Sequence, residues 1–280
     1  MFLAVASGKG GTGKTTVAVN LALSLETQVQ LLDCDADEPN VHTLLSLDVT
    51  ETKPVTTMVP RFDESKCKRT KECAKFCPNN AIFVSEKGIT FFPELCYGCA
   101  GCVIACPNEA IVEENRQIGV THHGQAHGID VVYGQLDVGE ALVVPVIKAV
   151  KAAAQKDKEI TILDCPPGVS CPLVESVHGS DFCLLVTEPT PFGLHDLKLA
   201  VEVIRRLGIP HGVIVNRAGI GDQEVYSYCE EEKIPILLEI PNSRDIAELF
   251  SEGIPFVTRM PEWKAKFQNL FHEIQRRLTQ

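Results

Sequence analysis

The chain has 280 residues, of which 45% are hydrophobic, 22% are charged and twelve are cysteines, and its formal net charge is −11. This composition predicts an ordinary soluble globular protein, argues against a nucleic-acid-binding surface, and includes no apolar run long enough to cross a bilayer. The apolar stretch at residues 2–6 is too short for a signal peptide, so we expect a reducing cytoplasm in which grouped cysteines serve metal or redox chemistry.

Residues 2–6 form the first predicted strand, and a helical pattern occupies residues 16–25. The glycine-rich stretch between them has the pattern G-x-x-x-x-G-K-[ST], which predicts a loop whose backbone N–H groups surround a polyphosphate. Lys14 is expected to contact the terminal phosphates, and the Thr15 hydroxyl is expected to bind Mg²⁺. The predicted nucleotide-binding residues of the loop are Gly8, Lys9, Gly10, Gly11, Thr12, Gly13, Lys14, Thr15 and Thr16.

A second lysine, Lys9, directly follows the first glycine of this loop. The resulting motif, Lys-Gly-Gly-x-Gly-Lys-Thr, resembles the deviant phosphate loop of the MinD/ParA/Mrp family of dimeric ATPases, which includes the nitrogenase iron protein. The resemblance implies that Lys9 crosses a dimer interface and contacts the nucleotide of the partner subunit. The alternative is a solvated loop lysine.

The second predicted strand, at residues 28–32, ends in an acidic segment that contains Asp33, Asp35 and Asp37. Open α/β sheets bind their ligands at the carboxyl ends of strands. The resemblance implies that this segment is switch I, in which Asp35 positions the attacking water and Asp33 supports it. The alternative is a solvated acidic loop that merely ends the strand.

From about Pro54 to Arg116 a cysteine-rich segment with an internal repeat replaces the aliphatic pattern. One half is an intact C-x₂-C-x₂-C-x₃-C-P run, typical of bacterial ferredoxins, at Cys96, Cys99, Cys102 and Cys106. Twenty-nine positions earlier the same spacing recurs with one ligand replaced, at Cys67, Thr70, Cys73 and Cys77. Zinc ribbons also use C-x₂-C pairs, but they need neither the third spaced cysteine nor the Cys-Pro. We therefore predict an iron–sulfur domain.

The last cysteine of each run in a two-cluster ferredoxin ligates the other cluster. A [4Fe–4S] cluster is therefore predicted on the complete set Cys77, Cys96, Cys99 and Cys102. The second set has only three thiols, Cys67, Cys73 and Cys106, because Thr70 stands where the fourth belongs. This set resembles that of seven-iron ferredoxins and predicts a [3Fe–4S] cluster, a labile [4Fe–4S] cluster or an empty site. The basic residues around Thr70 are either a solvated face or a dock for an acidic redox partner.

Residues 119–139 are rich in glycine and histidine and predict a loop that closes the insert, with a return to strand character near residues 129–133. A histidine metal site is the alternative to the loop. A helix is predicted over residues 143–154 and a buried strand over 160–164. The sequence after that strand is similar to Walker B and switch II of the family, which implies that Asp164 holds the Mg²⁺ shell and that the Gly168 N–H senses the γ-phosphate. Cys171 is either a buried structural cysteine or, by analogy with the nitrogenase iron protein, a ligand of a bridging cluster.

Strands at 182–186, 213–215 and 236–240 and a helix at 194–207 are predicted in the remainder. Asn216, with Arg217, resembles the adenine-binding Asn of the family, and Pro241 with Asp245 resembles the loop beside the base. No Asn-Lys-x-Asp motif occurs, which favours ATP over GTP. A final helix at 261–278 has one apolar face, which predicts core packing; a membrane-binding helix like that of MinD is the alternative.

The predicted fold is a doubly wound α/β, mostly parallel sheet of the P-loop type at residues 1–53 and 117–280, with a bacterial-type ferredoxin domain inserted at 54–116. The chain thus resembles MinD-superfamily ATPases that contain an inserted ferredoxin domain. The resemblance implies a cytoplasmic ATPase that uses ATP and Mg²⁺, with Lys9, Lys14 and Asp35 as catalytic residues. It implies an ATP-dependent homodimer, or a heterodimer with a related ATPase, that passes electrons to an unknown redox or client protein. The alternatives are an iron–sulfur cluster carrier of the Mrp type and a MinD-like positioning ATPase.

Overall fold

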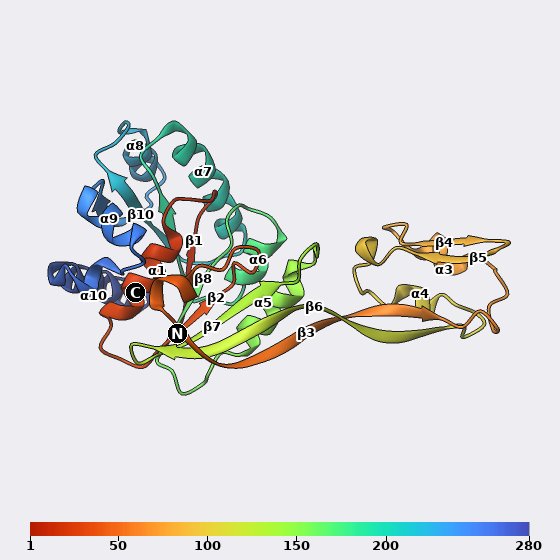
Figure 1. Cartoon of the computed structure of the whole chain (residues 1–280). Coiled ribbons are helices and arrows are strands. Elements are labelled where there is room, and N and C mark those ends of the chain that lie inside the picture. The colour runs from red at the N-terminus through yellow and green to blue at the C-terminus, as the bar shows by residue number, and fades with distance from the viewer. Residues whose placement is uncertain (280) are drawn as a thin grey trace.

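The computed structural model describes residues 1–279. Figure 1 shows a large body and a small insert, held away from the body by a long two-stranded arm. The strands are β1 (Phe2–Ala6), β2 (Val29–Asp33), β3 (Asp48–Phe62), β4 (Ile82–Ser85), β5 (Gly88–Phe91), β6 (Ile111–Ala126), β7 (Ile129–Leu136), β8 (Ile160–Asp164), β9 (Phe182–Thr187), β10 (His211–Ala218) and β11 (Ile236–Pro241). The helices are α1 (Lys14–Ser24), α2 (Val41–Leu45), α3 (Glu72–Phe76), η1 (Pro93–Leu95), α4 (Gly101–Ile104), α5 (Val143–Ala152), α6 (Cys171–Val177), α7 (Pro191–Arg206), α8 (Glu224–Glu231), α9 (Arg244–Ser251), η2 (Phe256–Thr258) and α10 (Pro261–Leu278).

The body is built on a sheet with the strand order β11-β10-β9-β1-β8-β2-β7-β6-β3. All pairs from β11 to β7 are parallel, whereas β6 pairs antiparallel with both β7 and β3. The predicted α/β fold with a mostly parallel sheet is confirmed. The phosphate loop follows β1, which lies between β8 and β9, so the predicted site is at the middle of the sheet.

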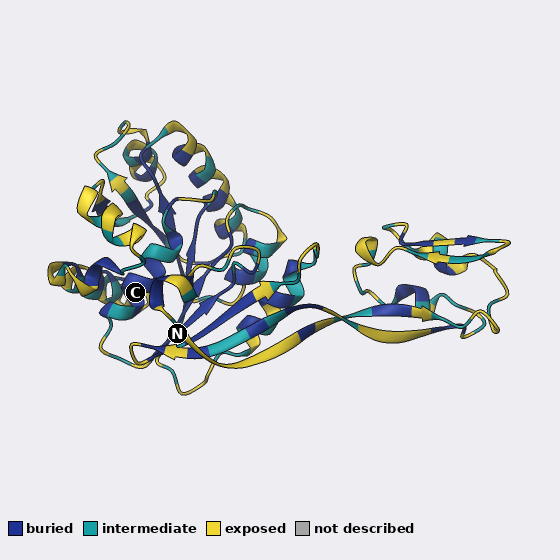
Figure 2. Cartoon of the chain, viewed as in Figure 1, coloured by how far each residue is buried: buried dark blue, intermediate teal, exposed yellow. Residues whose placement is uncertain are grey.

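Helices cover both faces of this sheet, and each face has its own apolar core. On one face α1, α2 and α10 contribute to the core, and on the other α5, α6, α7 and α8 do so. Figure 2 shows the buried central strands between these layers. The apolar face of α10 is buried through Trp263, Phe267, Leu270 and Ile274, so the prediction of core packing is confirmed. Among the described helices, none has the length and apolar character needed to cross a membrane.

The arm consists of β3 and β6, which pair from Asp48–Gln125 at the body to Phe62–Ile111 at the insert. At about 3.4 Å per residue, strands of this length reach about 50 Å. The prediction of a loop is wrong for residues 119–126, which lie in β6, whereas the strand expected near residues 129–133 is confirmed as part of β7. The pairing of β6 with a strand on each side outweighs the low strand propensity of its glycines. The predicted domain boundaries, 53/54 and 116/117, fall within β3 and β6 of the arm.

The insert is built from two similar halves, twenty-nine positions apart. The β4–β5 pair, in which Ile82 faces Phe91, has its equivalent in the β6–β3 pair, in which Ile111 faces Phe62. Helices α3 and α4 are equivalent in the same way. Left-handed backbone recurs at matching positions, namely Arg69 and Gly98, Lys71 and Ala100, and Asn80 and Glu109. The sequence repeat is therefore also a repeat of backbone conformation.

Candidate functional site

The glycine-rich loop turns sharply between β1 and α1. Gly11 and Gly13 have φ values of +77° and +93°, in the left-handed region that favours glycine. A Cβ atom on Gly13 would lie 2.3 Å from Nδ2 of Asn216, so a side chain at this position would clash. Lys14 begins α1 and is buried, which places its ammonium group within the loop region. This is the geometry that a phosphate-binding loop requires.

The end of β10 lies against this loop. The Asn216 Nδ2 donates a hydrogen bond of 2.8 Å to the Thr12 carbonyl oxygen, and its Oδ1 accepts one of 2.9 Å from the Arg217 N–H. Pro241 ends the neighbouring strand, where it pairs with Ala218. The structure therefore places Asn216 against the loop, whose backbone it supports directly, with Arg217 next to it and Pro241 at the end of the neighbouring strand.

Two buried carboxylates lie at adjacent strand ends, Asp33 on β2 and Asp164 on β8, and they are partners in the parallel register. Asp33 accepts backbone hydrogen bonds from Asp35, Asn40 and Val41 at 3.0–3.1 Å, so it fixes the loop before α2. By contrast, neither carboxylate oxygen of Asp164 has a hydrogen-bond partner within residues 1–279. A buried carboxylate needs a cation or donor.

Burial raises the pKa of the Asp164 carboxyl to about 7, and Thr15 and Lys14 act in the opposite direction. Because carboxylate and hydroxyl oxygens are the ligands that Mg²⁺ prefers, Thr15 and the unpartnered Asp164 fit a magnesium ion. Burial also raises the pKa of Asp35, to about 6, while Lys14 again opposes the shift. The loop lysine thus interacts with both acids that the sequence singled out.

Gly168 contacts the start of the glycine-rich loop, from the segment that is expected to be switch II. Its φ of +92° is left-handed, and its N–H donates a hydrogen bond of 3.2 Å to the Ser7 carbonyl oxygen. The N–H that is predicted to sense the γ-phosphate is therefore engaged by the phosphate loop in this conformation. Binding to a phosphate oxygen requires this bond to be exchanged.

Lys9 forms an ion pair that the sequence analysis missed. The Lys9 Nζ lies 3.4 Å from Oε2 of Glu188, and Nη1 of Arg217 lies 2.7 Å from Oε1 of the same carboxylate. The Glu188 side chain is only 8% exposed, so it is held between these two cations at the end of β9. An acid directly after a buried apolar strand, the signal that identified Asp33 and Asp164, would have revealed Glu188.

A second missed feature is a stack of three rings, which we call the ring stack (His42, Tyr133 and His122). The Tyr133 ring lies 4.6 Å from His42 on one side and 4.5 Å from His122 on the other, measured between centroids. Beyond it, Nδ1 of His122 lies 2.9 Å from the Thr52 hydroxyl on β3. The stack therefore joins α2, β7, β6 and β3 in one row.

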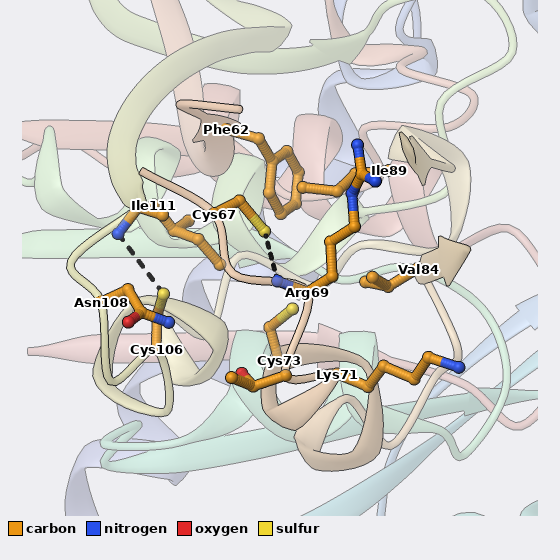
Figure 3. A pocket seen from close by; sticks show the side chains of 12 residues that line it. Phe62, Cys67, Arg69, Lys71, Cys73, Val84, Ile89, Cys106, Asn108 and Ile111 are labelled. Atoms are coloured by element: carbon orange, nitrogen blue, oxygen red, sulfur yellow. Dashed lines mark hydrogen bonds between the residues drawn. The ribbon is translucent and has the colours of Figure 1, made fainter. Parts of the chain in front are cut away.

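The cysteines of the insert line two separate hollows. One hollow is lined by the complete predicted set Cys77, Cys96, Cys99 and Cys102. The other is lined by the incomplete set and its threonine, Cys67, Thr70, Cys73 and Cys106, as Figure 3 shows for the three thiols. Each hollow thus includes the last cysteine of the other half of the repeat, as the ligand exchange predicts.

Backbone N–H groups point at the sulfurs of three of these residues. Sγ of Cys77 accepts from the Ala81 N–H at 3.3 Å, and Sγ of Cys106 accepts from the Ala110 N–H at 3.4 Å, in equivalent turns of the two halves. Sγ of Cys67 accepts from the Arg69 N–H at 3.4 Å. Such bonds stabilise negative charge on sulfur and are among the factors that set cluster potentials.

No three His, Cys, Asp or Glu side chains among residues 1–279 form a group that could hold a metal ion. An iron–sulfur cluster distributes its thiolates over several iron atoms, so its ligands surround a volume instead of meeting at one ion. The two cysteine-lined hollows fit that donor arrangement. Cys171 is exposed at the start of α6, which excludes the buried structural role, whereas Cys34, Cys165, Cys183 and Cys229 are buried in the body.

Comparison with known proteins gives both a family match and individual relatives. A family model described as the CobQ/CobB/MinD/ParA nucleotide binding domain matches residues 3–256. An uncharacterized protein of Methanocaldococcus jannaschii is 31% identical over 261 residues, which cover 92% of this chain and 91% of that protein. The iron-sulfur cluster carrier protein of Pyrococcus horikoshii is 25% identical over 273 residues, covering 91% of this chain and 78% of the carrier.

Solved structures share the fold. The septum site-determining protein MinD of Pyrococcus horikoshii, complexed with Mg-ADP, matches with a TM-score of 0.61 and 21% identity over 98% of this chain and 95% of its own. The cell division ATPase MinD of Pyrococcus furiosus matches with a TM-score of 0.60 and 23% identity over 98% of each chain. At these identities the likeness concerns the fold alone.

Proposed function

We propose that this chain, which belongs to the CobQ/CobB/MinD/ParA nucleotide-binding family, hydrolyses Mg-ATP as a dimer and couples its nucleotide state to electron transfer through iron–sulfur clusters. In this proposal residues 1–53 and 117–280 are the ATPase domain and residues 54–116 are a ferredoxin-type domain. The observation that carries the proposal is the division of seven cysteines between two hollows, in an insert that the arm joins to the sheet beside β7.

The ATPase chemistry is assigned to the residues gathered around the phosphate loop. Gly8 to Thr16 bind the phosphates through backbone N–H groups, and Lys14 neutralises the charge on the terminal phosphates. Thr15 and Asp164 would hold Mg²⁺, which supplies further charge stabilisation when bound. Asp35, partly buried and near Lys14, positions the attacking water. Asn216, Arg217 and Pro241 form the base side of the site.

The redox chemistry is assigned to the two hollows. Cys77, Cys96, Cys99 and Cys102 would hold a [4Fe–4S] cluster, and Cys67, Cys73 and Cys106 would hold a [3Fe–4S] or labile [4Fe–4S] cluster. These clusters supply one-electron chemistry when bound. The chain itself contributes in two ways. The N–H groups that donate to sulfur fix the thiols, and the small apolar core between the hollows limits the access of water.

The coupling is assigned to the ring stack. Asp33 accepts hydrogen bonds from the N–H groups of Asn40 and Val41, so a change in switch I moves the start of α2. His42 on α2 contacts Tyr133, which contacts His122 at the root of the arm. Interactions between aromatic rings contribute about 0.5–1.5 kcal/mol each beyond the area they bury, enough to bias the position of a small helix.

The proposal is tested by comparing ATP and ADP states of anaerobically purified protein. The Asp35→Ala protein with ATP should form a dimer whose clusters differ from those of the ADP state in reduction potential or chelator accessibility. Lys9→Ala should bind ATP yet show neither dimer nor cluster change. If ATP causes dimerisation while potential, EPR shape and chelation rate all stay fixed, coupling is refuted and the insert is an independent electron carrier.

A second candidate function is an iron–sulfur cluster carrier. It is favoured by Thr70, because a site with three thiols releases its cluster more easily, and by the similarity to carrier proteins at about one quarter identity. Transfer of iron to an apo-acceptor that accelerates with ATP would favour the carrier, whereas retention of both clusters would favour electron transfer. A MinD-like positioning ATPase is the third candidate, and the shared fold is its support.

A further inference from the structure

Exposed apolar side chains are concentrated around the complete cysteine set. Phe76 and Tyr97 line the same hollow as Cys77, Cys96 and Cys99, yet they are 56% and 67% exposed. The Phe76 ring packs against Gly101 at the start of α4, and Ile104, three residues further along that helix, is 84% exposed. We call Phe76, Tyr97 and Ile104 the apolar rim. Large apolar side chains that protrude beside a functional centre indicate an interaction site.

A basic segment precedes this rim in the sequence. Residues 66–75 contain five Lys or Arg residues and one Glu, in a chain whose net charge is −11. All five cations are exposed, and within residues 1–279 neither Lys68 nor Lys71 forms an ion pair. Helix α3 joins the two features, because Lys75 in the basic segment is followed directly by Phe76 in the rim. Arg69 and Lys71 line the hollow of the incomplete set, whereas Phe76 and Tyr97 line that of the complete set, so the basic segment and the apolar rim meet at α3.

The body of the same chain does not cover this surface, because the arm holds the insert away from it (Figure 1). The surface is also too small for a stable dimer. Three side chains of at most about 150–250 Å² each, all of them only partly exposed, give less than about 750 Å² per partner and less than about 1,500 Å² in total, which is below the total of 2,000 Å² or more of obligate dimers. The occupant is therefore a transient partner and not a second copy of this chain.

We propose that the apolar rim and the basic segment together form the docking face for a small acidic redox protein, which contacts the insert beside the exposed Cys99. This inference rests on the proposed function, because it takes the hollow of Cys77, Cys96, Cys99 and Cys102 to be a cluster site. A partner with an apolar centre and an acidic border fits this surface in shape and charge. Electron transfer slows steeply with distance, and the rim brings such a partner to the exposed side of that hollow.

The test uses the full chain with its clusters and an acidic plant-type [2Fe–2S] ferredoxin as the probe. Stopped-flow mixing of the reduced probe with the oxidised chain measures the second-order rate at which one electron leaves the [2Fe–2S] cluster of the probe, which is oxidised, and reduces a cluster of the chain. Carbodiimide cross-linking followed by mass spectrometry maps lysine–carboxylate contacts without relying on that rate. Tyr97→Ser combined with Ile104→Ser should lower the rate about tenfold, the effect of losing one interface hot spot. Phe83→Ser is the matched control, since Phe83 is 59% exposed on β4 of the same insert but lies outside the apolar rim.

The second part of the test reverses the charge of lysines in the basic segment. Lys71→Glu combined with Lys75→Glu should abolish the cross-links and remove the fall in rate with added salt, whereas Lys148→Glu on the body should change neither. Equal rates and cross-links in all variants, with normal iron content and EPR, would refute the docking face while leaving the clusters in place. Loss of iron from the unaltered protein would refute the proposed function instead. Tight binding of a single-stranded oligonucleotide that blocks the probe would also overturn the proposal and identify the face as a nucleic-acid site.

Discussion

Glu188→Gln should strengthen ATP-dependent dimerisation. In the single chain the Lys9 ammonium is held by its own subunit, through the pair with Glu188. A lysine that must reach the nucleotide of the partner subunit has to give up this pair first. Removing the charge of residue 188 while keeping its shape should therefore release Lys9 and favour the closed dimer.

The magnitude follows from the geometry of the pair. Two unit charges 3.4 Å apart attract each other by about 5 kcal/mol at an effective dielectric constant of 20. Most of this is offset by hydration, since the Lys9 side chain is 31% exposed, and a net value of about 1–2 kcal/mol remains. A symmetric dimer gives up two such pairs, so the gain is about 2–4 kcal/mol, or between about 30-fold and about 1,000-fold in the dimerisation constant.

Sedimentation velocity with ATP in the Asp35→Ala background measures this constant without hydrolysis. Glu231→Gln is the control, because it removes the same unit of charge from an exposed helix end. The double variant Lys9→Ala, Glu188→Gln should show no gain over Lys9→Ala alone, which isolates the interaction between the two residues. Unchanged or weaker dimerisation in Glu188→Gln, or an equal gain in the absence of Lys9, would refute the reasoning.

Three further outcomes are expected. Thr70→Cys should raise the iron content and remove any [3Fe–4S] EPR signal, because it completes the second ligand set; unchanged iron would count against that assignment. Lys14→Ala should abolish ATP binding in equilibrium dialysis, whereas Asp35→Ala should bind ATP and hydrolyse it poorly, and equal loss of binding would show that Asp35 has another role. Trp263→Ala should lower the free energy of unfolding by about 3–5 kcal/mol in urea titrations, because Trp263 is buried with its ring 5.5 Å from that of Phe256; a loss below about 1 kcal/mol would contradict the packing of α10.

The phosphate loop and the grouping of the cysteines could be predicted because local spacing encodes them. Gly13 has a left-handed backbone and no room for a Cβ atom, so the conformation of the loop requires glycine at this position and the sequence motif predicts it. The same holds for the cysteine runs, because the spacing within each run and the ligand exchange between the two halves predict which thiols share a hollow. In both cases the residues that matter lie close together in the sequence, or in two copies of one short pattern.

The features that escaped prediction depend on which strands become neighbours. Glu188 is 179 positions from Lys9 and meets it only because β1 and β9 are adjacent in the sheet. The ring stack needs the register that places Tyr133 opposite both Asp33 and His122. Glycine and histidine residues in β6 interrupt the alternation of apolar and polar residues that is typical of a strand. The strands that pair with β6, and not its local propensity, therefore determine its conformation.

Under the proposed coupling, the point of insertion would let nucleotide state reach the insert without a separate hinge. Only Ser46 and Leu47 separate α2 from β3, and the Leu47 N–H donates to the His42 carbonyl oxygen, so α2 and the first strand of the arm are tied together. The ring stack ties α2 to the second strand of the arm as well, through Tyr133 and His122. In the proposed coupling, a displacement of α2 would therefore act on both strands at once, and the paired strands would transmit it as a tilt. An insertion at any loop on the opposite edge of the sheet, beyond β11, would lack both connections.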